Sequence, residues 1–433
     1  MSIKKLAPSI LATTLLSQTM FANASEEDLQ KQIDELNSKI TELTQKSDSN
    51  SDSISSLISK DIQDAVTFNG FASFGLSQLS KNGKSEKYYY GQGSDLSILP
   101  NTWLGLQMNA RLYEKGEVIA QVVSKGNNDK SFDLDMEWLF YKQDLGANFS
   151  AQLGRIRFPV FIDSEVVYIG NIYPTVAPPA EIYSILPINH IDGTSVSYSG
   201  SAGDWGFDAK AVIWGNSSEN YNGYNLSLHR IFGVSFGANN DALSMHVGVF
   251  RAEERIEITD PVYAAEFGDV LTYKTAAIRY DDQRFYVSAE GISIKTKRDL
   301  LDENRNWNIT AGVYAGPVLF YVGHSSTRIT NSSNLINSLS QELGSIDLSA
   351  LYNLPPNTLA PVPRGYIYEP FLGRRQATET TGIKYNIAPN IALKAQVQYA
   401  AHFDGTQGNF SSATANISFN HMYIYDLAIQ ASF

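Results

Sequence analysis

The feature that most constrains the fold of this chain is an alternation of apolar and polar residues, which begins near residue 65 and continues to the C-terminus. From Val66 to Leu76 the even positions are mostly apolar or aromatic, whereas the odd positions are mainly small or polar. A period of two residues predicts a β-strand with one apolar face. The same pattern recurs in the segments 104–112, 132–140, 205–213, 243–249, 307–313 and 391–399.

The connections between these strands alternate in length. Short turns follow every second strand, and the other connections are mostly long. Seven short turns and eight longer connections predict sixteen strands. Strands of about ten residues with one apolar and one polar face suit a closed antiparallel barrel in a membrane, and a long soluble sandwich or a propeller is the alternative. The expected longer connections are 78–101, 126–131, 158–192, 215–228, 250–271, 294–306, 325–373 and 401–420.

The composition argues against several classes of protein. The 433 residues include no cysteine and six histidines, with no two histidines at metal-ligand spacing, so we expect no disulfide, no structural zinc and no cofactor. No run of eighteen apolar residues is present, which argues against a transmembrane helix. The formal net charge of -12 argues against nucleic acid as a partner, because that binding depends on neutralising phosphates.

The first residues predict an export signal. Lys4 and Lys5 form a basic start, the segment 6–16 is apolar but too short to span a bilayer, and Ala22-Asn23-Ala24 is a small-x-small cleavage box. We therefore expect residues 1–24 to be a signal peptide that is removed after Ala24, and the mature protein to be exported from a bacterial cytoplasm.

Residues 25–60 have a different period. Apolar residues spaced alternately by four and three predict a short heptad seam, and a single chain could bury very little of it. We expect a periplasmic coiled coil between subunits, and a frayed amphipathic helix or a flexible spacer is the alternative. Ile and Leu in this arrangement favour two strands. The seam residues are Leu29, Ile33, Leu36, Ile40 and Leu43.

The last strand carries the most specific signal in the chain. It ends in an aromatic residue and has apolar or aromatic residues at alternate positions, and it resembles the C-terminal signature strand of Gram-negative outer-membrane proteins, which the barrel-assembly machinery reads. The residues that carry this resemblance are Tyr425, Leu427, Ile429, Ala431 and Phe433.

Residues 65–433 as a whole resemble the trimeric sixteen-stranded porins, and the leading heptads resemble porin subfamilies that carry an N-terminal coiled coil. The resemblance implies an all-β fold, a sixteen-stranded antiparallel transmembrane β-barrel with a short N-terminal α-helical coiled coil, in the outer membrane of a Gram-negative bacterium. It also implies a homotrimer in contact with lipid, against the two-strand preference of the heptads. The implied function is passive diffusion of small hydrophilic solutes and ions through a water-filled pore.

The third long connection, residues 158–192, is rich in proline and in apolar residues. Proline cannot join a strand ladder, so we expect an ordered segment that is not a strand. In porins the loop at this position folds into the lumen and narrows it, whereas an external loop is the alternative. The acids that the resemblance places at the constriction are Asp163, Glu165 and Glu181.

Two arginines precede this loop, and their orientation is ambiguous. The parity of Leu153 aims Arg155 and Arg157 at the lipid, and a β-bulge at Gly154 would turn them into the lumen. Hairpin arithmetic then places them opposite Asp135 and Asp133. The predicted arrangement gives a transverse field across the pore, and wall salt bridges are the alternative. The remaining predicted pore-lining charges are Glu137, Arg111 and Lys394.

Enzymatic activity is not expected. Asp192 lies near His190 in the sequence, but no nucleophile elbow accompanies them, and Gly-rich phosphate loops are absent. The alternative function is outer-membrane tethering or adhesion, with the coiled coil in contact with the periplasm or cell wall. A tethering barrel could be filled with apolar side chains, whereas the expected inward positions here are small and polar.

Overall fold

The computed structural model divides the chain into two compact units, Met1–Ala65 and Val66–Phe433. It describes residues 31, 34–35, 37–39, 41–42, 44–46, 65–80, 87–126, 132–186, 188–221, 224–259, 264–297, 303–330, 374–404, 406–411 and 419–433. In the first unit the described positions from 31 to 46 are helical and exposed, and Lys39 pairs with Glu35 at 3.3 Å. The predicted signal peptide and all five seam residues lie outside the described residues. Within the described positions, no helix is both long and apolar enough to cross a membrane.

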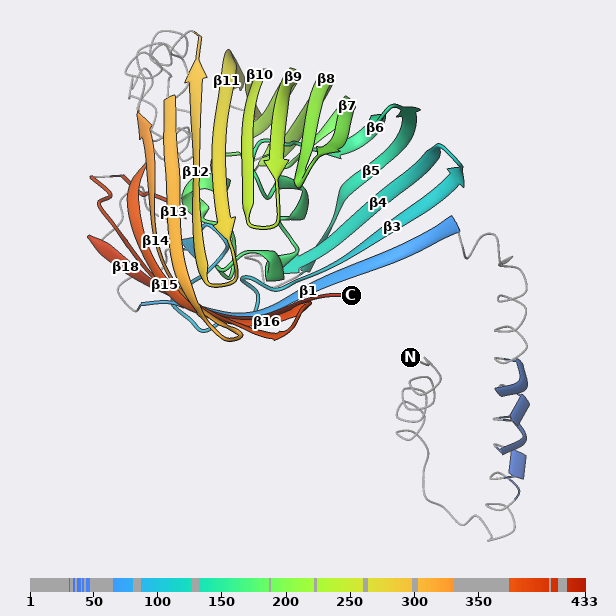
Figure 1. Cartoon of the computed structure of the whole chain (residues 1–433). Coiled ribbons are helices and arrows are strands. Elements are labelled where there is room, and N and C mark those ends of the chain that lie inside the picture. Colours follow the sequence, from blue (N-terminus) through green and yellow to red (C-terminus); the bar gives the residue numbers. More distant parts are fainter. Residues whose placement is uncertain are drawn as a thin grey trace, which may run out of the picture. The chain divides into compact units, whose positions relative to one another are not determined.

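The second unit is a closed antiparallel barrel of sixteen strands, which confirms the strand number expected from the alternating connections. Neighbours in the chain are neighbours in the sheet, and β18 closes the ring against β1 (Figure 1). The barrel strands are β1 (Val66–Leu79), β3 (Trp103–Tyr113), β4 (Gly116–Gly126), β5 (Phe132–Gly146), β6 (Phe149–Arg157), β7 (His190–Ala202), β8 (Trp205–Tyr221), β9 (Tyr224–Asn239), β10 (Leu243–Thr259), β11 (Ala264–Asp281), β12 (Phe285–Thr296), β13 (Glu303–Ala315), β14 (Val318–Thr330), β15 (Arg375–Ala388), β16 (Ile391–Ala401) and β18 (His421–Ser432).

Several connections expected to be long are short, because the strands continue through them. β8 and β9 are joined by residues 222–223, β10 and β11 by 260–263, and β12 and β13 by 297–302. At these strand ends the alternation is reversed. Inward positions such as Leu228, Ile256 and Leu271 are apolar and buried, whereas outward positions such as Arg255 and Glu257 are charged and exposed. Two short strands, β2 (Lys87–Tyr88) and β17 (Phe410–Ser411), pair with each other in the connections β1–β3 and β16–β18.

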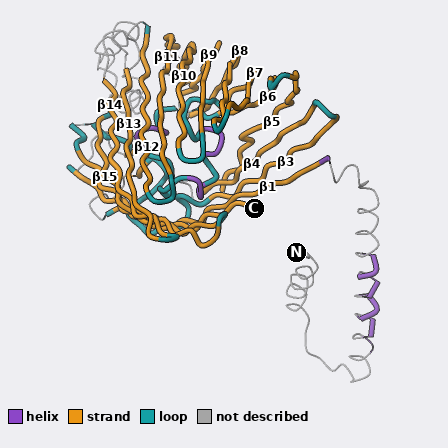
Figure 2. The backbone as a smooth tube through the Cα atoms, in the orientation of Figure 1, coloured by secondary structure: helices purple, strands orange, loops and turns teal. Residues whose placement is uncertain are grey.

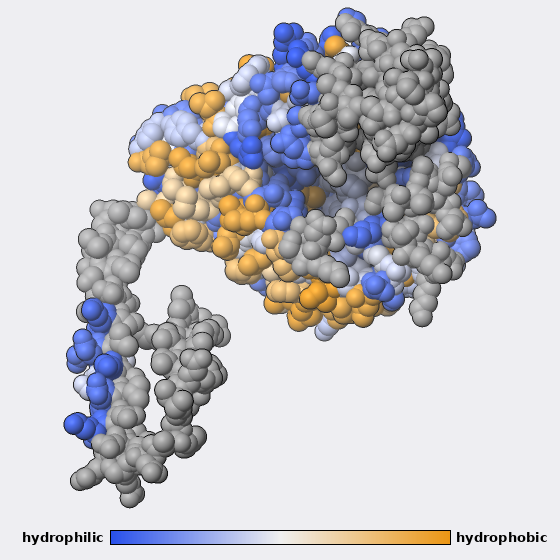
Figure 3. Space-filling view, turned by 180° about the vertical axis from the view of Figure 1, so that it is seen from behind, coloured by the Kyte–Doolittle hydropathy of each residue, from blue (hydrophilic) through white to orange (hydrophobic). Residues whose placement is uncertain are grey.

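Many of the apolar residues that revealed the strands point outward, whereas Phe140 of β5 is buried in an internal cluster. Phe74, Leu106, Leu134, Leu153 and Val247 all have exposed side chains, and Figure 3 shows areas of hydrophobic residues on the outer surface. An exposed apolar belt is a liability in water and is what a membrane barrel presents to lipid.

The C-terminal strand β18 lies between β16 and β1. The backbone groups of Gly70 and Phe433 exchange two hydrogen bonds, of 2.6 and 2.8 Å, and fix the closing register. The side chains of Tyr425, Leu427, Ile429 and Phe433 are exposed on the outer face, and Ala431 is half-buried.

The inside of the barrel is not uniformly polar, which corrects the expectation of small and polar inward residues. Inward-facing residues of β7 to β12 form an apolar cluster with the connection between β6 and β7. Figure 2 shows this connection and its short helices inside the curve of the strands. The strand members of the cluster include Ile191, Val212, Leu228, Phe250, Ile256, Leu271, Tyr273, Ile292 and Ile294.

Candidate functional site

Residues 158–189, called the lumenal loop below, run from the end of β6 to the start of β7 and contact inward-facing residues around the barrel. It contains three short helical segments, which are η1 (Ser164–Val166), η2 (Gly170–Ile172) and α3 (Ala180–Tyr183). The proline at 179 precedes α3, as expected for a residue without a backbone N–H. The polar contacts along the loop form four groups, and each group joins the loop to a different set of barrel strands.

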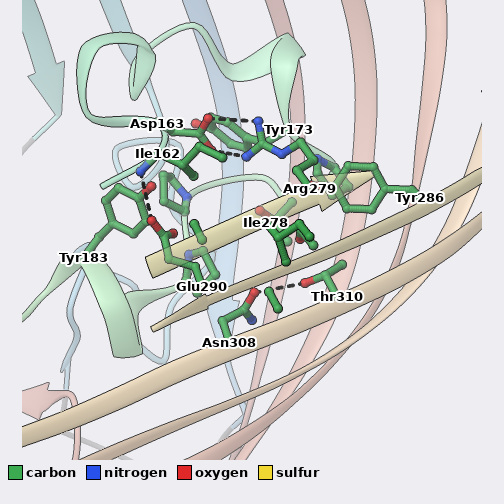
Figure 4. Close-up of a pocket in the computed structure, with 17 residues that line it drawn as sticks. Ile162, Asp163, Tyr173, Tyr183, Ile278, Arg279, Tyr286, Glu290, Asn308 and Thr310 are labelled. Atoms are coloured by element: carbon green, nitrogen blue, oxygen red, sulfur yellow. Dashed lines mark hydrogen bonds and ion pairs between the residues drawn. The ribbon is translucent and has the colours of Figure 1, made fainter. Parts of the chain in front are cut away.

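The first group ties the start of the loop to β11 and β12. Arg279 donates from two nitrogens to the two carboxylate oxygens of Asp163, at 3.0 and 2.5 Å, and the backbone N–H of Ile162 donates to Glu290 at 3.0 Å (Figure 4). The space beside these contacts is small, about 30 Å³, so on this side the loop packs closely against the wall.

The second group is centred on η1. Glu165 contacts Lys210 of β8 at 2.5 Å, and the Lys210 charge holds the pKa of the Glu165 carboxyl below its usual range. The Lys210 side chain is largely buried, while 54% of the Glu165 side chain is exposed. Because Glu165 lies inside the ring of strands, this exposure marks an open, solvent-accessible space beside η1.

The third group lies against β4 and β5. Arg157 donates to Glu137 at 2.6 Å and to the backbone carbonyl of Ser164 at 2.7 Å. The hydroxyl group of Tyr168 donates a hydrogen bond to Glu137 at 2.8 Å. Burial raises the pKa of this phenol to about 12. Tyr168 therefore stays a hydrogen-bond donor at any physiological pH.

Lys125 of β4 extends this third group to the exposed part of the wall. Its ammonium group lies 2.9 Å from Asp135 and 3.5 Å from Glu137. The side chains of Lys125 and Asp135 are 37% and 48% exposed, so they border open space as Glu165 does. Sequence reasoning missed Lys125, although its alternation with the outward residues of β4 was a usable signal.

The fourth group ties the middle of the loop to β15, β16 and β18. The Lys394 ammonium is fully buried and donates to the backbone carbonyls of Gly170, Tyr173 and Thr175, the last two at 2.7 Å. Lys384 donates to the carbonyl of Asn171 at 2.5 Å. Lys394 was predicted to line the pore. The structure instead places it beneath the loop, where carbonyl oxygens replace water around its charge.

Glu181 of α3 belongs to the same side of the barrel and is also buried. Its carboxylate accepts hydrogen bonds from Ser325 at 2.8 Å, from Gln376 at 2.7 Å and from Thr378. Its backbone carbonyl accepts from Asn306 and Thr327. Glu181 was expected to face an arginine cluster, and the structure surrounds it with neutral donors. The inward positions of β13 to β15 carry these donors, which sequence reasoning did not pair with the loop.

The predicted positions of the two arginines are wrong in register. Hairpin arithmetic assumed a turn around residue 145, but the turn is formed by Ala147 and Asn148, both with positive φ. Such residues make the two-residue hairpin turns that match strand twist. Arg155 therefore lies opposite Leu139 and not Asp135. Asp133 lies opposite Lys125, far along β5 from Arg157.

Of the two alternatives for these arginines, the bulge at Gly154 is absent, because Gly154 pairs without a shift with both neighbouring strands. A β-bulge occurs instead at Glu137 of β5. Gln121 pairs with Trp138 and Val122 with Met136, which leaves Glu137 as the extra residue of β5. This bulge lets Glu137 turn inward toward Arg157. Gly154 has a different role, since its φ is +132° and a Cβ would lie 2.4 Å from the carbonyl of Leu139.

Arg155 thus keeps the outward parity that the sequence indicated without a bulge. It forms a bidentate ion pair with Asp192 of β7, at 2.8 and 3.0 Å, in a groove lined by the exposed side chains of Leu139, Leu153 and Trp214. Arg111 is exposed near the turn end of β3, opposite Glu117. Neither arginine touches the lumenal loop through a contact within the described residues.

The loop thus meets two chemically different walls, and the solvent-exposed charges beside it have both signs. Lys125, Asp135 and Glu165 are each more than a third exposed. No group of three or more metal-ligating side chains occurs in the described part of the chain. A passage bordered by such charges can hydrate and orient small polar solutes and ions.

No protein-family model matches this chain, and no curated protein matches it. Among solved structures, the fold is similar to OmpT, an outer membrane protein of Vibrio cholerae, in a trimer form, with a TM-score of 0.50, 11% identity, and coverage of 85% of this chain and 99% of that chain. It is also similar to an anion-selective porin from Comamonas acidovorans, with a TM-score of 0.50, 12% identity, and coverage of 85% and 99%. At these identities the likeness shows the fold, which is that of outer-membrane porin barrels.

Proposed function

We propose that this chain is an outer-membrane porin, through which small hydrophilic solutes and ions diffuse passively past the lumenal loop. The observation that carries the proposal is the position of Glu165. It lies on a loop inside a closed barrel, yet more than half of its side chain is exposed. A water-filled space therefore continues beside the loop, and its border is charged.

The outer-membrane location is supported by the outward apolar belt and by the exposed row that ends at Phe433. In the proposed route, the signal peptide directs export and the C-terminal strand is read by the barrel-assembly machinery. Deleting Phe433 is then expected to lower the amount of folded barrel in the outer membrane while signal cleavage continues. Unchanged levels of heat-modifiable barrel in the deletion variant would refute this part of the proposal.

The proposed assembly is a homotrimer whose heptads pair in the periplasm. The similar Vibrio cholerae barrel is described in a trimer form, and the described positions between 31 and 46 are helical with exposed polar side chains. Channel closure in three equal steps, together with a trimeric native mass, is the expected result. A stable dimer contradicts it.

The channel is tested most sharply by cysteine chemistry, because the chain has no cysteine of its own. Glu165→Cys places a single thiol at the proposed passage. A bulky charged thiol reagent should then reduce the single-channel conductance of the folded barrel in a planar bilayer. The matched control is Asp282→Cys, in the turn after β11, where the same reagent should change nothing.

Either of two results would contradict the porin proposal. One is a folded, heat-modifiable barrel that gives no conductance steps. The other is a conductance that is equally insensitive to the reagent at both positions, because the current would then follow a route that does not pass η1.

A further inference from the structure

The outer face of the barrel carries a row of cations on β13, β14 and β15, at the strand ends opposite the short turns 316–317 and 389–390. Arg305 lies directly opposite Arg328, and Arg328 directly opposite Arg375. Adjacent strands are about 4.8 Å apart, so the backbone positions of these three arginines span about 10 Å. On the next two strands, Ser293 of β12 lies opposite Arg305, and Lys274 of β11 lies opposite Ser293. Lys274 is therefore a further cation at the same level of the sheet.

The orientation of the row follows from its neighbours in sequence. Asn306, Thr327 and Gln376 each donate a hydrogen bond to Glu181 of the lumenal loop, so they face inward. Alternation along a strand then directs the preceding or following residue outward. Arg305 and Arg328 are exposed, and Arg375 is partly exposed.

Like charges directly opposite each other on neighbouring strands destabilise a sheet unless something compensates them. Arg375 has a partner, Asp404, at 3.2 Å. Within the described residues, neither Arg305 nor Arg328 has an acidic group within ion-pair distance. The nearest acid along the outer face of β15 is Glu379, which lies opposite His324 and contacts it at 2.5 Å. Among the described side chains, two arginines of the row are thus without an acidic partner, and an external anion can compensate their charge.

The row also has a defined level relative to the apolar belt. Trp307 is two residues from Arg305 on the same outer face, is 41% exposed and packs its ring against that of His324, with 5.0 Å between ring centroids. Beyond it on the same strand, Ile309 and Val313 are exposed and apolar. An outward tryptophan between apolar and cationic residues is typical of the headgroup level of a membrane.

We propose that Arg305, Arg328 and Arg375 bind the phosphate of an anionic lipid headgroup in the leaflet on the side of the long connections. Guanidinium groups suit this ligand, because their paired N–H donors match phosphate oxygens in a bidentate arrangement. The acyl chains of the same lipid would cover Ile309 and Val313. In the leaflet proposed to face outward, the chemical class is a phosphorylated glycolipid. The inference rests on the proposed membrane location but not on the passage of solutes.

The test measures binding of a bisphosphorylated lipid A to the full-length, folded barrel in detergent micelles. The double variant Arg305→Gln with Arg328→Gln is expected to weaken this binding at least about tenfold, because two charge-assisted contacts are lost. The matched control is Lys115→Gln with Arg284→Gln, which removes the same charge from short turns at the other end of the strands. It should bind lipid A as tightly as the unaltered chain. Heat-modifiable gel mobility shows that both double variants are folded.

Two further probes identify the source of the phosphate. Dephosphorylated lipid A should bind at least about tenfold more weakly than the phosphorylated form, and millimolar inorganic phosphate should compete poorly. Equal binding of lipid A to both double variants would overturn the proposal. Full competition by inorganic phosphate would overturn the lipid assignment in favour of a free-anion site. Conductance is expected to be unchanged in the arginine variant, so failure of this inference and failure of the channel are distinguishable.

Discussion

The two ends of the lumenal loop and its middle are held by different forces. At the ends, Phe158, Ile182 and Ile188 are buried against apolar residues of β7 to β12, beside the ion pair of Asp163 with Arg279. In the middle, between η1 and α3, the loop is held by buried charges and hydrogen bonds to β4, β5 and β13 to β18. Apolar packing is non-directional, and it tolerates replacement of one apolar side chain by another of similar size. The polar contacts, in contrast, require one particular position of the loop. The comparison suggests that packing attaches the loop to the wall and that polar contacts set where the passage remains.

The largest effect is expected where the polar contacts are most buried. Arg157→Ala leaves Glu137 as a buried carboxylate that keeps only Lys125 and Tyr168, and should lower the free energy of unfolding by about 3 to 5 kcal/mol. The measurement is urea unfolding of the folded barrel in micelles. Lys142→Ala is the control. The ion pair of Lys142 with Glu117 is partly exposed on both sides, and its loss should cost about 1 kcal/mol or less. Equal losses in the two variants would show that burial does not distinguish these pairs.

The apolar attachment is probed by Ile182→Ala. The side chain is completely buried, and truncation should destabilise by about 2 to 4 kcal/mol through lost burial and the cavity left behind. Ile172→Ala on the same loop is the control, because Ile172 is 37% exposed. If the two variants unfold at the same urea concentration, the cluster on β7 to β12 does not hold the loop.

A smaller loss is expected at α3. Glu181→Gln keeps the size of the side chain but replaces one accepting oxygen by a donor that faces the donors Gln376 and Thr378. The expected cost is about 1 to 3 kcal/mol, from hydrogen bonds that can no longer be satisfied. Glu379→Gln, at an exposed position, is the control. Single-channel conductance should also become noisier in Glu181→Gln only, as the middle of the loop loses an anchor.

The smallest effect on stability, and the clearest on selectivity, is expected from Glu165→Gln. Removal of one negative charge beside the open space should shift the reversal potential in a salt gradient toward anions. Lys210→Gln should shift it toward cations. If neither variant shifts the potential, ions do not pass close to this pair.

The same pair predicts a pH dependence. Lys210 lowers the pKa of Glu165 in the folded protein, so its stabilising contribution is present above the ordinary carboxyl pKa and is lost as the pH falls through the folded value. The selectivity of the unaltered barrel should therefore persist to more acidic pH than that of an isolated carboxylate and then move toward anions. Glu165→Gln should lack this acidic transition, which reversal potentials across the range would reveal.

Sequence alone determined the barrel, its strand number and its apolar outer face, because alternation along a strand and the lengths of connections are local properties. It also indicated that the loop is rich in burial-prone residues. It could not determine where that loop binds, since Lys394 and Glu181 meet their partners across distances of more than a hundred residues.

Register was likewise decided by the tertiary structure. Moving the turn to Ala147 and Asn148 and placing the extra residue at Glu137 separated two arginines that share one parity in the sequence. Arg155 stayed outside with Asp192, and Arg157 reached Glu137 within the barrel. The sequence pattern shows which residues of a strand alternate. It does not show where Arg157, the last residue of β6, can reach, because that depends on the bulge in the neighbouring strand β5 and on the point where the chain leaves the sheet to enter the loop. Those choices depend on contacts that form only when the ring of strands has closed.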